Sequence, residues 1–385
     1  MIDFVRVGMK ITKYRKKLNL TQDDADLPTA RAINTLFKEE YTHLKLTFSI
    51  IVDRLVSMKK QYNDDGTYVY VQDEQGNYMY TATSAYEEWK QIVGDGSQFN
   101  VASHTMTHYY FGKDNEGGWE DSNGDGTPDK YYAPNNVTIE VDVSGQILRV
   151  LFEGQDVLGF IIAGVDRDQT QFTKDYMNMT EEYDALRHTF YGINDPDNLN
   201  WRQMYSYSIK HYETSSNAST NSISTYDQVK DVDIDKWRDY IDQPIKQNGW
   251  GIFTMHKIIK DGATSTGFYI YEFQFRALCD YIREKQESGE LWCATYDESI
   301  KYVKQMQSST VRAINHDDEF VEVYLTDTLD NSKYDMELTV KVEIPDEWET
   351  AVADGDFLTI HEDNQGKFVY VNVAPDAGSG VITQS

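Results

Sequence analysis

The chain has 385 residues, 40% of them hydrophobic and 13% aromatic, and 64 acidic against 36 basic residues give a formal charge of −28. This length allows one large core and a second, smaller domain. The negative charge disfavours nucleic acid, anionic lipid and polyanionic polymers as partners unless positive charge is locally concentrated, so neutral partners are favoured. No apolar run approaches the roughly 20 residues that span a bilayer, so no membrane insertion is expected.

Up to about residue 310, short apolar runs alternate with amphipathic segments, which predicts alternating strands and helices. Such alternation implies parallel strands, in a sheet or barrel whose site lies at the carboxyl ends of the strands. Stretches 61–81 and 109–156 interrupt the pattern with glycine-containing turns and are interpreted as insertions, the first a hairpin. The expected strands lie at 16–24, 45–52, 99–103, 157–165, 250–256 and 289–295, and the expected helices at 27–41, 84–96, 170–187, 235–247, 271–286 and 296–306.

After residue 310 the pattern changes to short alternating strands separated by turn residues, as in FVEVYLTD and MELTVKVEIP. This pattern is typical of a small antiparallel β-sandwich. We therefore expect a first domain over 1–309 and an accessory domain over 310–385. Cys279 and Cys293 are too few for a disulfide scaffold and lie in apolar stretches, so buried free thiols are expected.

Two groups of polar residues follow predicted strands, Asp23-Asp24 after the first and His104 to His108 after the third. Histidines at positions i and i+4 can reach one metal ion, and a carboxylate can complete the ligand set. By themselves, an Asp-Asp pair is more often a solvated turn, and a lone pair of histidines at this spacing is more often structural. Their position at strand ends in consecutive βα units favours a metal site, at which Asp23 fits the role of a base.

These segments resemble motifs of the polysaccharide deacetylase family, also called carbohydrate esterase family four. LTQDDA at 20–25 is similar to the family's first motif, SHTMTH at 103–108 to its second, and GWGIFTMH at 249–256 to its fifth. GELWCATYDESIKYV at 289–303 looks like the family's closing strand and helix. The resemblance covers roughly residues 15–307, and it implies an α/β fold, an irregular (β/α)7-type barrel.

The resemblance also implies roles for individual residues. Asp24, His104 and His108 would hold one divalent transition metal, with zinc expected and cobalt or nickel as alternatives. Asp23 would be the general base and His256 the general acid, and a neighbouring carboxylate, Asp233 or Asp235, would keep that histidine protonated. Without the other motifs, His256 at the end of a buried strand would be interpreted as a core histidine.

Two departures from the family pattern bear on these roles. Ala25 stands where the first motif has glycine, so the turn after Asp24 must avoid a conformation that only glycine tolerates. The family's arginine motif, in which an arginine pairs with the catalytic aspartate, has no clean match. Arg167 is a candidate for that arginine, although its spacing is wrong.

A second metal signal lies in DSNGDGTPD at 121–129. Oxygen-bearing side chains at alternating positions, with glycine at the sixth, resemble calcium-binding loops. A structural calcium ion is expected there, and an Asp-rich turn without a metal is the alternative. The expected ligands are Asp121, Asn123, Asp125, Thr127 through its carbonyl, and Asp129.

The resemblance implies a metal-dependent deacetylase that removes acetyl groups from a neutral polysaccharide or oligosaccharide, either O-acetylated xylan or an N-acetylglucosamine polymer. Such a substrate implies an extracellular or cell-surface protein, although the first residues, MIDFVRVGMKITKYRKK, contain no signal-peptide apolar region. One alternative is a non-catalytic carbohydrate-binding protein on the same barrel. Another is a metal hydrolase that acts on small amides.

Overall fold

The computed structural model describes residues 10–11, 17–64, 68–108, 119–120, 130–131, 137–163, 176–188, 191–209, 234–263, 268–316 and 319–384. Among these residues, no helix combines the length and apolar character needed to cross a membrane. The chain divides into two compact units, Lys16–Asp297 and Glu298–Ser385, the latter together with Met1–Arg15. The division falls inside a helix, Tyr296–Ser308 (α8), ahead of the boundary expected at residue 310.

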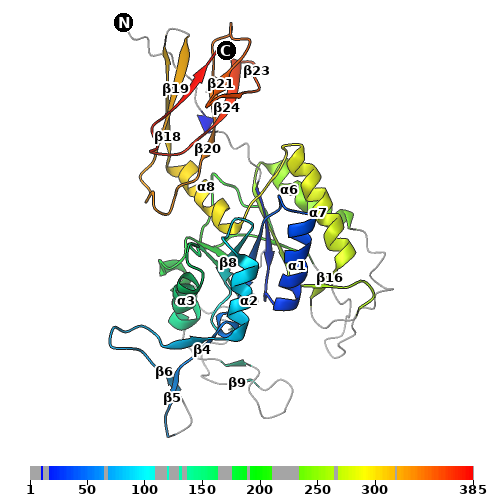
Figure 1. The fold of residues 1–385 in the computed structure, drawn as a ribbon, viewed down its shortest axis with the longest axis vertical. Helices are drawn as coiled ribbons and strands as arrows, with labels where there is room; N and C mark the ends of the chain where they lie inside the picture. The colour runs from blue at the N-terminus through cyan, green and yellow to red at the C-terminus, as the bar shows by residue number, and fades with distance from the viewer. Residues whose placement is uncertain are drawn as a thin grey trace. The chain divides into compact units, whose positions relative to one another are not determined.

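The larger unit is built around an eight-stranded sheet in the order β12-β11-β8-β3-β2-β14-β13, with β17 also paired to β2. Strand β8 of this sheet and the neighbouring helices α1 and α2 are labelled in Figure 1. All strand pairs of the sheet are parallel. The carboxyl ends of its strands therefore meet at one edge. The strands are β2 (Lys17–Gln22), β3 (Leu46–Ile50), β8 (Phe99–Ser103), β11 (Gly159–Ile161), β12 (Ala185–Arg187), β13 (Tyr207–Ser208), β14 (Trp250–Met255) and β17 (Trp292–Cys293).

The fold class is mixed α/β, as predicted, but the structure does not show the expected barrel. Within the described residues, β12 and β13 stand at opposite ends of the sheet and do not pair as strands. One isolated parallel bridge joins Arg187 at the end of β12 to Met204, just before β13. The strands around the candidate site thus form an irregular sheet in the described part of the chain.

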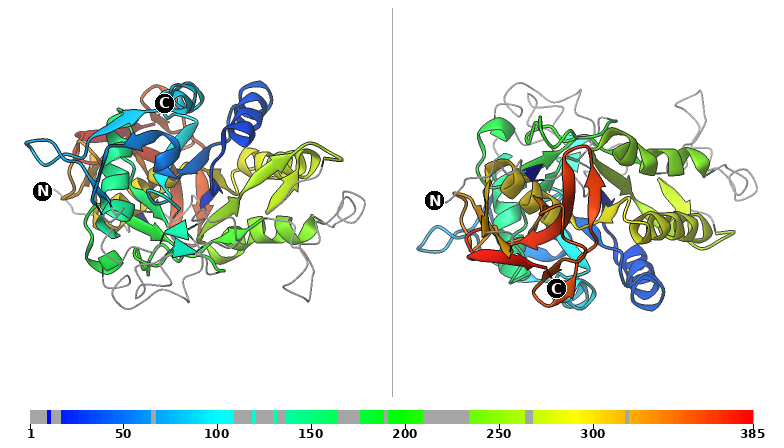
Figure 2. Two further views of the ribbon diagram at one scale, coloured as in Figure 1. Left: turned by 90° about the horizontal axis from the view of Figure 1, so that it is seen from below. Right: turned by 90° about the horizontal axis from the view of Figure 1, so that it is seen from above.

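Helices lie around the outside of the parallel strands in the larger unit (Figure 2). Helix α1 begins where Pro28 occupies its first turn and Asp26 caps it by accepting a 2.8 Å hydrogen bond from the Thr29 amide. Its buried face packs Phe37 against Phe99 of β8, with ring centroids 5.6 Å apart. The helices of this unit are α1 (Leu27–Glu39), α2 (Ser84–Val93), α3 (Ser144–Leu151), α6 (Asp235–Gln247) and α7 (Glu272–Glu287), with short helices η1 (Val52–Arg54) and η3 (Ile139–Val143).

The first expected insertion, 61–81, lies within antiparallel strand pairs of the larger unit that follow η1. Strand β4 pairs with β7, and β5 pairs with β6 to form the hairpin. A parallel pair, β15 with β16, follows β14 elsewhere in this unit, and β9 pairs antiparallel with β10. These strands are β4 (Val56–Met58), β5 (Lys60–Tyr62), β6 (Tyr68–Tyr70), β7 (Tyr80–Ala82), β9 (Trp119–Glu120), β10 (Lys130–Tyr131), β15 (Lys257–Ile259) and β16 (Tyr269–Tyr271).

Two expectations about local structure are wrong. The helix expected over 170–187 does not extend to its end, because Ala185–Arg187 is a buried strand paired with β11. Segment 109–156 was expected to be an insertion throughout, yet η3 and α3 lie within it and bury Val141 and Leu148 in the core. Burial against β11, which local periodicity does not report, decides the conformation of Ala185–Arg187, whereas the buried residues Ile147, Leu148 and Leu151 of α3 recur with helical spacing.

The smaller unit contains two antiparallel sheets, in the orders β1-β20-β24-β23 and β18-β19-β25-β21-β22. Buried and partly exposed residues alternate along β20, so one face of this strand is turned inward. Its strands are β1 (Lys10–Ile11), β18 (Thr310–His316), β19 (Phe320–Thr326), β20 (Leu338–Glu343), β21 (Val352–Ala353), β22 (Asp356–Phe357), β23 (His361–Asp363), β24 (Gly366–Val373) and β25 (Ser379–Thr383).

Cys279 on α7 and Cys293 on β17 are both buried free thiols, as predicted from the sequence.

Candidate metal centre

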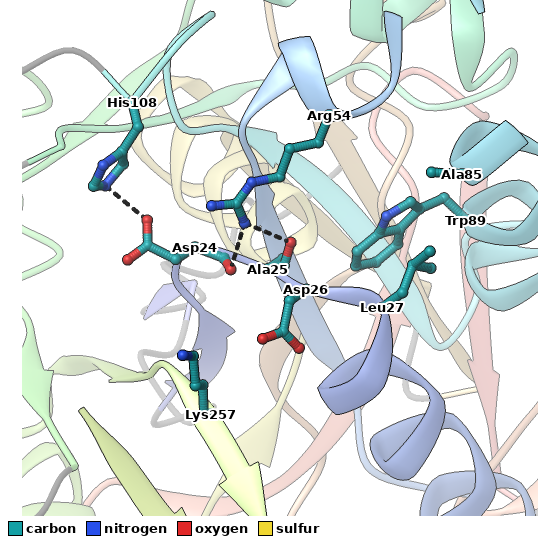
Figure 3. Close-up of a pocket in the computed structure, with 9 residues that line it drawn as sticks. All are labelled: Asp24, Ala25, Asp26, Leu27, Arg54, Ala85, Trp89, His108 and Lys257. Atoms are coloured by element: carbon teal, nitrogen blue, oxygen red, sulfur yellow. Dashed lines mark hydrogen bonds and ion pairs between the residues drawn. The ribbon is translucent and has the colours of Figure 1, made fainter. Parts of the chain in front are cut away.

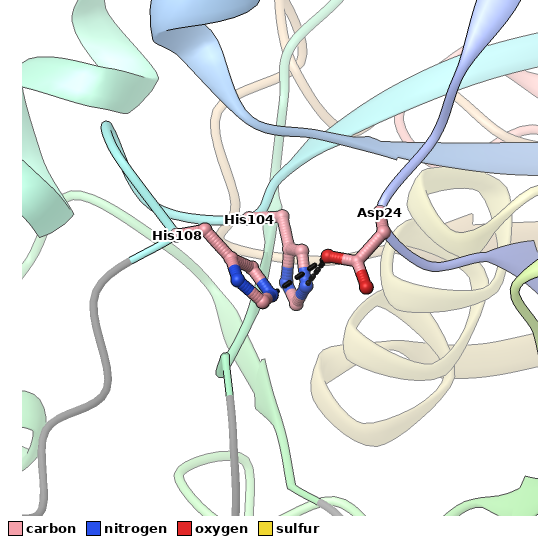
Figure 4. A group of neighbouring side chains, drawn as sticks. All are labelled: Asp24, His104 and His108. Carbon is pink, nitrogen blue, oxygen red and sulfur yellow. Dashed lines mark ion pairs between the residues drawn. The ribbon is translucent and has the colours of Figure 1, made fainter. Parts of the chain in front are cut away.

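Asp24, His104 and His108 come together where β2 and β8 end (Figure 4). Both strands pair in parallel with β3, so the residues after them lie at the same edge of the sheet. Asp24 Oδ1 is 2.7 Å from His108 Nε2 and 3.2 Å from His104 Nε2. One ligand atom from each residue lies within 4.8 Å of the others, which suits a single small cation.

The hydrogen bond on the far side of the His104 ring prepares this histidine to bind a metal. Nδ1 of His104 lies 2.8 Å from the carbonyl oxygen of Ile161, at the end of the neighbouring strand β11. Because a carbonyl oxygen only accepts, Nδ1 carries a proton, which leaves Nε2 as the nitrogen that would bind a metal ion. A carbonyl bond of this kind is typical of metal-binding histidines, so the donor set fits zinc or a similar divalent ion.

The backbone around the three residues adopts conformations that non-glycine residues rarely take. Asp24, Thr105 and His108 have φ values of +51°, +68° and +63°. Such conformations cost free energy and persist where the surrounding structure imposes them. Ala25 itself has no positive φ, and its amide donates a 3.1 Å hydrogen bond to the Ser49 carbonyl. The turn thus avoids the conformation for which the family uses glycine.

The charge state of Asp24 also suits a metal ligand. Burial opposes its ionisation, but the neighbouring imidazoles of His104 and His108 outweigh burial and hold the pKa of Asp24 well below its ordinary value. Asp24 is therefore ionised at neutral pH, as a metal-binding carboxylate must be.

The carboxylate of Asp23, next to Asp24 in the chain, forms a buried ion pair. Its Oδ2 lies 2.7 Å from a terminal nitrogen of Arg187, and its Oδ1 accepts a 3.2 Å hydrogen bond from the Ser49 hydroxyl. Arg187 ends β12, is 1% exposed, and also contacts the Ser206 hydroxyl at 3.3 Å. The candidate base is thus oriented by an arginine and a serine from two other strands.

Arg187 is the functional residue that reasoning from the sequence missed. The earlier candidate, Arg167, lies outside the described residues. The segment ALRH at 185–188 could have indicated this residue. Like the other strands that end at the site, it is a short apolar run followed by two polar residues. It was hidden because the same residues were assigned to the end of a helix.

His256 follows β14 and faces the other oxygen of the same carboxylate. Its Nε2 lies 3.7 Å from Asp24 Oδ2, and its ring lies 5.1 Å from that of Phe268. The structure therefore brings three of the predicted residues, His104, His108 and His256, to the carboxylate of Asp24. Of the carboxylates proposed to keep His256 protonated, Asp235 is exposed at the start of α6 and pairs with Arg238, and Asp233 lies outside the described residues.

Glu140, on the short π-helix η3, anchors the segment between the two histidines. It accepts hydrogen bonds from the Thr107 amide at 2.9 Å and the Thr107 hydroxyl at 2.7 Å. Burial raises the pKa of Glu140 to about 7, although these hydrogen bonds favour its ionised form. A single turn of π-helix frequently marks a functional position, and this one places a carboxylate beside His108.

A cavity of about 450 Å³ opens beside the metal ligands (Figure 3). Asp24 and His108 form one side, and Leu27, Ala85 and Trp89 line another. A cavity of this size admits a sugar residue or a comparable group. The predicted calcium ligands at 121–129 lie outside the described residues.

No family model matches the chain. A segment of 213 residues, 52% of the chain, is 26% identical to a gellan lyase from a Bacillus species, and the match spans only 8% of that protein's length. Among solved structures, alpha-L-fucosidase isoenzyme 1 from Paenibacillus thiaminolyticus aligns over 97% of each chain, with 9% identity and a TM-score of 0.32. A TM-score this low supports no conclusion about fold or function.

Proposed function

We propose that this protein is a metal-dependent deacetylase that hydrolyses acetyl groups from a polysaccharide. The observation that carries the proposal is the convergence of Asp24, His104 and His108, with His256 against the same carboxylate. The 26% identity to a protein named gellan lyase supports a carbohydrate polymer as the substrate class. The overall charge of −28 favours a mainly neutral chain, such as O-acetylated xylan or an N-acetylglucosamine polymer.

The chain's own residues divide the hydrolysis between them. Asp24, His104 and His108 would hold a divalent ion, which would supply Lewis acidity toward an acyl carbonyl and water. Asp23 takes a proton from the attacking water, while Arg187 and Ser49 hold its carboxylate in place. His256 returns a proton to the leaving oxygen or nitrogen, so that acetate and a free hydroxyl or amine are the products.

Acetate release from a panel of acetylated polymers tests this function. The zinc-loaded or cobalt-loaded protein should release acetate from acetylated xylan or acetylated chito-oligosaccharides. Asp23→Asn should abolish release while metal content, measured by elemental analysis, stays at one ion per chain. Loss of the metal in that variant would show that the roles of Asp23 and Asp24 are exchanged. Asp239→Asn, at an exposed position on α6, is the matched control and should behave as wild type.

The second candidate is a carbohydrate-binding protein without catalysis. This candidate would be supported if the protein bound the same oligosaccharides but released no acetate from them, whichever metal ion was added. The pairing of Asp23 with Arg187 favours the enzyme, because a protein that only binds has no need of a buried carboxylate oriented in this way.

A further inference from the structure

The cavity beside the metal centre contains two basic side chains that the proposed mechanism does not use. Arg54 ends η1 and Lys257 begins β15, and they reach toward the cavity from opposite sides (Figure 3). The chain carries 64 acidic and only 36 basic residues, so two basic groups in one small cavity run against its composition. The group that these two side chains would bind determines which substrates the cavity prefers.

Arg54 is held in place by hydrogen bonds to backbone oxygens, and its charge also interacts with the neighbouring carboxylate of Asp53. One terminal nitrogen donates to the carbonyl oxygens of Asp24 at 3.0 Å and Ala25 at 3.3 Å. In the described part of the chain, its guanidinium makes no ion pair with a carboxylate. These bonds fix the guanidinium beside the metal ligands and leave its other nitrogens for a bound group.

Lys257 follows the candidate acid His256 directly. Among the described residues, its ammonium group makes neither an ion pair nor a hydrogen bond. Unlike Arg54, it has no polar partner in the described part of the chain that accounts for its position. A half-buried ammonium group that faces a cavity without a partner is suited to an anionic ligand.

The carboxylates that line the same cavity are already engaged. Asp24 faces the imidazoles of His104 and His108 and would bind the metal ion. Asp26, which lies between the two basic residues in Figure 3, caps helix α1 through the Thr29 amide. The two carboxylates and the two basic groups that line the cavity cancel in charge, so a bound divalent ion would give the site a net positive charge, which attracts an anion.

We propose that this cavity binds a carboxylate on the substrate, the acidic group of a uronic acid residue beside the acetylated sugar, between Arg54 and Lys257. This inference rests on the proposed function and narrows its substrate class. It agrees with the overall charge of −28, because the preferred polymer is mainly neutral and carries isolated acidic residues. Arg54 provides a planar donor for the carboxylate, and Lys257 provides a second charge from the opposite wall.

Binding of a matched pair of sugars tests the proposal without relying on catalysis. The pair is a non-acetylated oligosaccharide containing one uronic acid and the same oligosaccharide with its carboxyl group reduced to an alcohol. Calorimetric titration of the zinc-loaded protein at low salt should show about tenfold tighter binding of the acidic form. Lys257→Met should remove most of this difference, whereas Lys260→Met, an exposed lysine on the same segment, should preserve it.

Equal affinity of the wild-type protein for the two sugars would overturn the proposal. The proposal would also be overturned if Lys257→Met still bound the acidic sugar more tightly than the reduced one. The carboxylate would then bind at another place, such as the metal ion itself. Failure of the deacetylase function is distinguishable. In that case no acetylated substrate releases acetate, while the difference in affinity and its dependence on Lys257 persist.

Discussion

The two units of this protein bury different kinds of residue. In the larger unit, charged side chains such as Asp23, Arg187 and Glu140 are buried where parallel strands end or beside the metal ligands. In the smaller unit, the buried polar residues among those described are Ser299 and Gln305, both on α8, and the buried residues of its strands are apolar. Burying charge is costly, so a fold retains it where it serves binding or catalysis.

The largest expected effect comes from breaking the buried ion pair of the larger unit. Arg187→Met leaves Asp23 buried without its cation, and the free energy of unfolding should fall by about 3 to 5 kcal/mol. Urea denaturation measures this loss. In the double variant with Asp23→Asn, most of the loss should be recovered, because no buried charge then lacks a partner. If Arg187→Met alone were as stable as wild type, the fold would not depend on the Asp23–Arg187 ion pair.

Glu140 should make the stability of the larger unit depend on pH. In the folded protein its pKa is about 7, above the ordinary value of 4.5. Glu140 therefore contributes its full share to the free energy of unfolding below pH 4.5, and this share is lost as the pH rises through 7. The loss amounts to roughly 3 kcal/mol if burial is complete. Unfolding measured between pH 4.5 and 8 should show a flatter profile for Glu140→Gln. If the stability of Glu140→Gln and of wild type changed with pH in the same way, Glu140 would not be the source of the pH dependence.

The metal ligands and the candidate acid should respond differently to substitution. His104→Ala removes one of the three candidate ligands and should weaken zinc binding by more than about 100-fold, the upper range for changing a residue that only supports a metal ligand. His256→Gln should change zinc affinity less than about threefold, because this ring lies 3.7 Å from Asp24 but outside the ligand set. Competition with a chelating dye measures both affinities. A comparable loss in the two variants would make His256 a fourth ligand.

The smallest effect is expected in the smaller unit. Ile382→Val on β25 removes one methylene group from a 1% exposed side chain and should lower stability by about 1 kcal/mol. Zinc affinity should equal that of wild type, since the ligand residues all belong to the larger unit. A changed zinc affinity would mean that the core of the smaller unit influences the metal centre.

Much of the local structure and the centre of the site were predictable from the sequence. Strand β8 and helix α6 have the predicted bounds, because their apolar residues recur with the period of a strand or a helix. Asp24, His104 and His108 were found because each follows an apolar strand, and parallel strands bring their carboxyl ends together.

Only the tertiary structure identified the partners of these residues. Arg187 lies 164 positions from Asp23, and Glu140 lies 33 positions from Thr107, so no local spacing connects either pair. Strand β12 was mistaken for part of a helix because its burial against β11 decides its conformation. Arg54 and Lys257 likewise face one cavity only because the ends of β3 and β14 meet at the same edge of the sheet. Local sequence thus determined many of the strands and the candidate metal ligands, whereas long-range packing determined which side chains support them, because such contacts leave no periodic pattern in the chain.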